Sequence, residues 1–102
     1  MVSIVEESIG RAATKIAEDI DANCIITLGQ KKREQYEDDY SHIDVSVAIF
    51  KKVKKGVYER KEYETRTRKV TGGSVIPIKE ILLEAITRRY IDKGDRVVCV
   101  QD

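Results

Sequence analysis

Apolar and polar positions recur along this chain with two different periods, which divide it into helical and extended segments. Between residues 3 and 20 the apolar positions follow steps of three and four, which predicts an amphipathic helix. The letters "SIVE" at Ser3 to Glu6 have the spacing of a capping box, so the helix is expected to begin there. Its predicted apolar stripe, rich in alanine and therefore suited to close packing on a sheet, is Val5, Ile9, Ala12, Ala13, Ile16, Ala17 and Ile20.

Two uninterrupted apolar runs, "CIITL" from Cys24 and "RVVCV" from Arg96, predict strands covered on both faces. The second run follows another helical pattern, which starts after Pro77. Arg88 and Arg89 suit the carboxyl end of that helix, and Gly94 is the expected left-handed cap. The apolar stripe of this helix is Ile78, Ile81, Leu82, Ala85, Ile86 and Tyr90.

The middle of the chain reads as a charged pair of strands. "HIDVSVAIF" at His42 to Phe50 alternates apolar and polar positions, which predicts a half-exposed strand. A turn is expected near Lys54 to Gly56, and a second strand follows whose many charges are typical of a sheet edge. The segment after Gly29, "QKKREQYEDDY", is expected to be a short solvated helix or loop.

Helix, strand, charged strand pair, helix and strand together predict one α/β domain over residues 1–102. The order predicts a three-layer domain with a largely parallel sheet and flanking helices. The chain is interpreted as an N-terminal fragment of a longer protein.

Composition narrows the function classes. The chain has 19 Lys and Arg against 18 Asp and Glu, so it has no global attraction for nucleic acid or anionic membranes. No apolar run approaches the length that crosses a membrane, and no signal peptide is present, so a cytoplasmic protein is expected. Cys24 and Cys99 lie in apolar runs and are expected to be small core residues without a disulfide.

Two glycine-containing breaks are candidate anion sites, because each precedes an expected helix whose free amide groups favour an anion. A tight turn is the competing interpretation at both places. The candidate residues are Gly29, Gln30, Lys31, Thr71, Gly72, Gly73 and Ser74.

The segment from Lys51 to Lys69 holds nine basic and three acidic residues, a local positive patch. We expect it to act as an interface, and the alternative of single-stranded nucleic-acid binding through cationic and aromatic side chains is disfavoured. The candidate interface residues are Lys51, Lys52, Lys54, Lys55, Tyr58 and Tyr63.

No catalytic or metal-binding residues are predicted. His42 has no cysteine, serine or aspartate arrangement that makes a nucleophile system. The acidic triplet Glu37, Asp38 and Asp39 lacks the spacing of a calcium loop.

Both ends of the chain resemble the C-terminal domain of pyruvate kinase. "IGRAATKIAEDIDANCIITLG" is similar to its opening helix and strand, and "AITRRYIDKGDRVVCVQD" to its late helix and "GD-x-VVVV" strand. The middle departs from that family. Its effector site is not carried over, because Leu28, Gly29 and Gln30 follow Thr27 where the family has a Ser/Thr-rich loop.

The same ends resemble the N-terminal domain of archaeal diadenylate cyclase proteins. In that family a catalytic domain with Asp-Gly-Ala and Arg-His-Arg motifs joins two ATP molecules into cyclic di-AMP with a divalent metal, Mn or Mg. The resemblance implies a non-catalytic assembly or regulatory domain without a cofactor of its own. Its implied partners are the catalytic domain of the same chain and further copies in a homo-oligomer. A free-standing phosphate-ligand sensor is the alternative.

Overall fold

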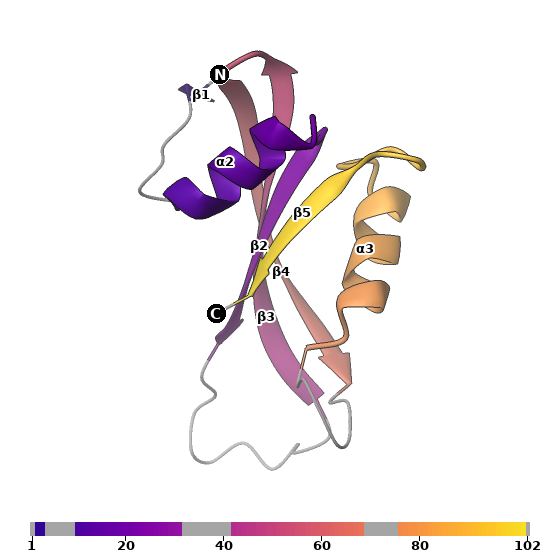
Figure 1. Cartoon of the computed structure of the whole chain (residues 1–102). Helices are drawn as coiled ribbons and strands as arrows, with labels where there is room; N and C mark the ends of the chain where they lie inside the picture. Colours follow the sequence, from indigo (N-terminus) through magenta and orange to yellow (C-terminus); the bar gives the residue numbers. More distant parts are fainter. Residues whose placement is uncertain (1, 4–9, 32–41, 69–75, 102) are drawn as a thin grey trace.

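The computed structural model describes residues 2, 3, 10–31, 42–68 and 76–101 as one mixed sheet with a short helix on each face (Figure 1). The sheet order is β1-β4-β3-β2-β5. The elements are β1 (Val2–Ser3), α2 (Arg11–Asp19), β2 (Cys24–Lys31), β3 (His42–Lys54), β4 (Val57–Arg68), α3 (Ile78–Thr87) and β5 (Val97–Gln101).

The prediction of a three-layer, largely parallel sheet was wrong. Only β2 and β5 pair in parallel, whereas β1–β4, β4–β3 and β3–β2 are antiparallel. The physical reason lies in the charged middle of the chain, whose strands of 13 and 12 residues are joined by a tight turn. Such a connection joins only antiparallel strands, and this long hairpin forms the centre of the sheet.

The two helices cover opposite faces of the sheet (Figure 1). On one face, Ile81 and Ala85 of α3 belong to a buried cluster with alternate residues of β2 and β3. On the other face, Ala13 and Ala17 of α2 pack with Ile25, and Phe50 and Tyr58 complete that cluster. The alternation predicted for β3 is confirmed by its buried residues Ile43, Val45, Val47 and Ile49.

The first helix is described only from Arg11 onward. Ser3 lies in β1 and pairs with Val57. The predicted capping box and first helical turn fall on residues 4–9, which lie outside the described residues. Helix α2 begins at Arg11. Its contact with the sheet is a narrow one through Ala13, Thr14 and Ala17, which leaves Ile16 and Ile20 51% and 39% exposed.

An arginine in the left-handed conformation, Arg89, follows the C-cap residue Arg88 of helix α3. The amide of Arg89 donates to Ile86 O at 3.0 Å and that of Tyr90 to Ala85 O at 2.9 Å, the two hydrogen bonds of a Schellman motif. Arg89 has φ 62° at the position where glycine is usual. The prediction that Gly94 caps this helix was therefore wrong, since Gly94 belongs to the turn that follows.

Candidate functional site

The first predicted anion site does not lie at a helix entrance. Gly29, Gln30 and Lys31 continue strand β2 and pair with Ser46, Val45 and Asp44. The expected strand end at Gly29 was wrong, because the pairing with β3 outweighs the weak strand preference of glycine. Anion binding at Gly29 to Lys31 stays a prediction, but the argument from free amide groups at a helix entrance no longer supports it. The second site, Thr71, Gly72, Gly73 and Ser74, lies outside the described residues.

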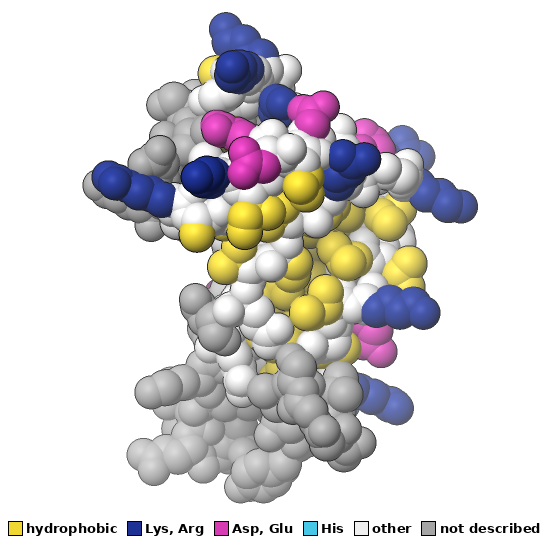
Figure 2. Space-filling model, viewed as in Figure 1, with side chains coloured by type: hydrophobic (Ala, Val, Ile, Leu, Met, Phe, Trp, Pro, Cys, Tyr) yellow, Lys and Arg dark blue, Asp and Glu magenta, His cyan; other side chains and the backbone are white. Residues whose placement is uncertain are grey.

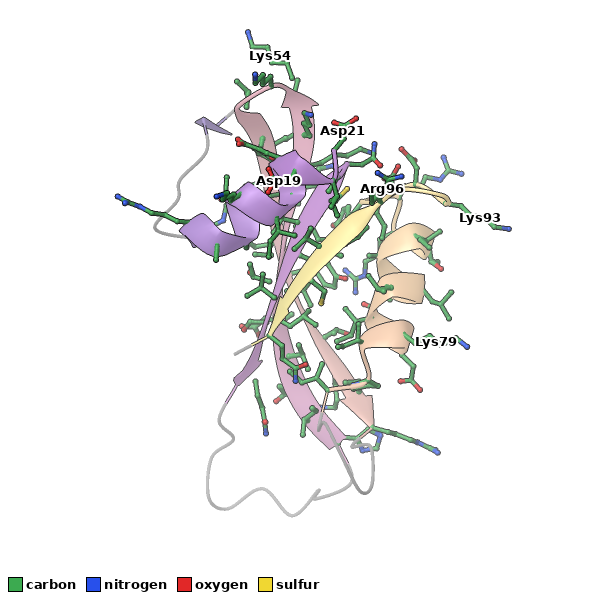
Figure 3. The ribbon with its side chains drawn as sticks, viewed as in Figure 1. Asp19, Asp21, Lys54, Lys79, Lys93 and Arg96 are labelled. Atoms are coloured by element: carbon green, nitrogen blue, oxygen red, sulfur yellow. The ribbon has the colours of Figure 1, made fainter. Side chains whose placement is uncertain are left out.

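The predicted interface residues do not share one face. Lys51 pairs with Asp92 at 2.7 Å and Lys52 with Asp21 at 3.0 Å, while Lys54 and Lys55 are exposed at the hairpin end. Figure 3 shows Lys54 projecting from that end of the molecule. The exposed pairs contribute little to stability. These lysines are accordingly spread around the hairpin.

The two tyrosines of the predicted interface lie on opposite faces of β4. Tyr58 is 2% exposed and belongs to the cluster under α2, whereas Tyr63 packs against the cluster under α3. Arg88 lies over the Tyr63 ring at 4.4 Å. Burial raises the pKa of Tyr63 to about 12, and its buried hydroxyl has no hydrogen-bond partner among the described residues. The two rings therefore offer no common surface for stacking bases.

Strand β5 forms an apolar edge of the sheet. It pairs with β2 on one side, and no other described strand pairs with its second side. Val97, Val98 and Val100 are half-buried and Cys99 is exposed, so the prediction of a strand buried on both faces was wrong. An edge strand has no neighbour to cover its outer side. No charged residue interrupts Val97 to Val100, although edges usually carry charges that prevent pairing.

Helix α2 extends this apolar edge. The Arg96 guanidinium donates to Ile20 O, which holds the end of α2 beside the start of β5. Ile16 lies one turn before Ile20 on the same side of α2, and both side chains are exposed. Figure 2 looks onto this side of the molecule, where apolar side chains gather between α2 and β5. We call Ile16, Ile20, Val98 and Val100 the β5 surface. Cys99, which pairs with Ile26, lies on the α3 face of the same strand.

Polar contacts around its first residues fix the position of β5. The Arg96 amide donates to Asn23 Oδ1 at 2.8 Å, and the Asn23 amide donates to Arg96 O at 2.8 Å. Asp95 accepts from the Cys24 thiol at 3.6 Å and from the Asp92 amide at 2.9 Å. These bonds tie the loop before β5 to the start of β2, so the β5 surface is preorganised.

The two cysteines, both free, lie in different environments. Cys24 is buried, and burial together with the neighbouring Asp95 raises its pKa to about 12. Cys99 is exposed, although partial burial raises its pKa as well. The prediction of two core cysteines is thus confirmed for Cys24 and wrong for Cys99. Both thiols are protonated at neutral pH, a state that does not suit a nucleophile.

We expect one thiol of the folded protein to react with a disulfide reagent such as dithionitrobenzoate. Cys99 is accessible and should react within minutes at pH 8, whereas Cys24 should react only after denaturant unfolds the chain. The absorbance of the released thiolate measures both phases. Rapid reaction of two thiols in the native protein would contradict the burial of Cys24, and Cys99→Ser should abolish the native-state phase alone.

A shallow hollow lies on the α2 side of the sheet. It has a volume of about 490 Å³, and small side chains on β2 and β3 form its base. Arg60, Glu62 and Glu64 of β4 line one side of it. The mixed charges of this rim favour no single kind of ligand.

Comparison with known proteins gives no family for the chain: no protein-family model, curated protein or solved structure matches it. Within the described ranges, His, Cys, Asp and Glu side chains form no group of three that could hold a metal ion. None of the helices described is long and apolar enough to cross a membrane.

Proposed function

We propose that the chain is a non-catalytic accessory domain that assembles a diadenylate cyclase-like protein in the cytoplasm. The parent protein would make cyclic di-AMP from ATP with a divalent metal on a separate catalytic domain. The resemblance of both chain ends to that family supports the parent. The assembly role is supported by one observation above all, the uncharged open edge of β5.

The partner at this edge is a second copy of the chain. An apolar strand without charges is complementary to itself, because two copies in antiparallel register satisfy each other's backbone groups without requiring opposite charges. Two-fold pairing also closes the assembly after two copies. The ten-stranded sheet that results has α2 of each copy flanking the junction, where Ile16 and Ile20 add apolar contact.

The parent is tested with the protein encoded by the complete gene. We expect a domain with Asp-Gly-Ala and Arg-His-Arg motifs in it, and cyclic di-AMP formation from ATP and Mn²⁺. Deleting residues 1–102 should leave that chemistry in the catalytic domain while lowering the mass of the assembly. Chromatography of the nucleotides and light scattering measure the two effects. Cyclic di-AMP made by the pure 102-residue chain would refute the non-catalytic role.

A further inference from the structure

A pocket of about 290 Å³ lies where the end of α3 meets β3 and β4. The buried side chain of Ile49 and the ring of Tyr90 form its apolar part. Three cationic side chains line it, Lys51, Lys61 and Arg89, against one carboxylate, Glu59. The lining is therefore positive, although the chain as a whole is nearly neutral.

Two of these cations are available to a ligand. Lys61 and Arg89 make no ion pair with any carboxylate in the part of the chain that the structure describes. Lys61 is held over the Tyr90 ring, with its Nζ 5.1 Å from the ring centroid. Lys51 differs, because Asp92 at 2.7 Å and Asp95 at 3.8 Å already balance its charge. The pocket therefore contains one lysine, Lys51, whose charge is balanced by two aspartates, and two cations, Lys61 and Arg89, that form no ion pair among the described residues.

The backbone at Arg89 provides an independent observation. Its φ of 62° is unfavourable for any residue with a Cβ, and glycine would end α3 in the same motif without strain. Strained positions of this kind are retained where the side chain has a task. At Arg89 the strained backbone carries a guanidinium that lines the pocket and has no carboxylate partner among the described residues.

The carboxyl end of a helix normally repels anions, and here three carbonyl groups of the last turn of α3 accept hydrogen bonds. Glu84 O accepts from the Arg88 amide at 2.8 Å, Ala85 O from Tyr90 and Ile86 O from Arg89. The Schellman motif therefore reduces the number of free acceptors that face the pocket. The guanidinium fork of Arg89 and the ammonium of Lys61 are the groups that bind phosphoryl oxygens in proteins.

We propose that Lys51, Lys61 and Arg89 form a site for the phosphoryl group of a small phosphorylated ligand, with Ile49 and Tyr90 against its apolar part. The site is separate from the β5 surface and does not rest on the assembly role. It also differs from the two anion sites expected from sequence, at Gly29 and Thr71.

The test is a titration of the isotope-labelled chain with inorganic phosphate and with pyrophosphate, followed by amide NMR at constant ionic strength. We expect saturable shifts at residues 49–51, 59–61 and 89–90, larger for pyrophosphate. Arg89→Gln, which keeps the strained backbone, should weaken pyrophosphate binding at least about tenfold, as the loss of a charge-assisted pair does. Lys79→Gln removes one positive charge near the other end of α3, where Figure 3 shows Lys79 projecting outward, and should leave binding unchanged.

A second variant separates binding from folding. Arg89→Gly should raise the melting temperature, because glycine relieves the left-handed strain, and should weaken pyrophosphate binding as much as Arg89→Gln does. Equal weakening by Lys79→Gln, shifts confined to Gly29–Lys31 or Thr71–Ser74, or unchanged binding by Arg89→Gly would each overturn the site.

Discussion

Replacing Ile81 by alanine is expected to lower the free energy of unfolding by about 3 kcal/mol, the effect of emptying a well-packed core position. Ile81 is 1% exposed and belongs to the cluster between α3 and the sheet. A ten-residue helix is marginal by itself, so α3 depends on this contact. Chemical denaturation followed by circular dichroism measures the change.

The control for this variant is Leu83→Ala on the same helix. It also removes three carbons, but Leu83 is 55% exposed, so the loss should stay below about 0.5 kcal/mol. Similar losses for both variants would mean that α3 does not pack on the sheet through Ile81.

Local patterns predicted the elements better than their arrangement. The alternation of β3 and the stripe of α3 follow from side-chain periodicity, and the turn near Gly56 follows from the glycine that interrupts the basic tract. The structure contains all three. The prediction of a largely parallel sheet was wrong, because side-chain periodicity contains no information about which strands pair. The interpretation gave the central place to the chain ends, whereas the long hairpin of β3 and β4 has it.

The candidate sites could not be predicted from local sequence patterns either, because they depend on how the strands and helices are arranged. An apolar run such as "VVCV" is typical of a buried strand, and only the sheet order reveals that β5 stands at an edge. The pocket at Arg89 joins residues from β3, β4 and the end of α3. The one sign of it in the sequence is an arginine, instead of a glycine, four residues after Ala85, the last buried position of α3.

Replacing Cys99 by lysine is expected to weaken self-association at least about tenfold, because a charged side chain protects an edge strand from pairing. Cys99 is exposed, so the substitution leaves the core intact. Cys99→Ser is the matched control: it removes the thiol without adding charge and should associate as the wild type does. The pair of variants also excludes a disulfide as the cause of association.

The most direct measurement of the assembly role is sedimentation equilibrium of wild type, Cys99→Ser and Cys99→Lys in a reducing buffer. We predict twice the chain mass for the wild type and Cys99→Ser, and a lower mean mass, nearer that of one chain, for Cys99→Lys over the same concentration range. A wild type that stays monomeric up to millimolar concentration, or a Cys99→Lys variant that dimerises as strongly as the wild type, would contradict the proposed assembly through β5.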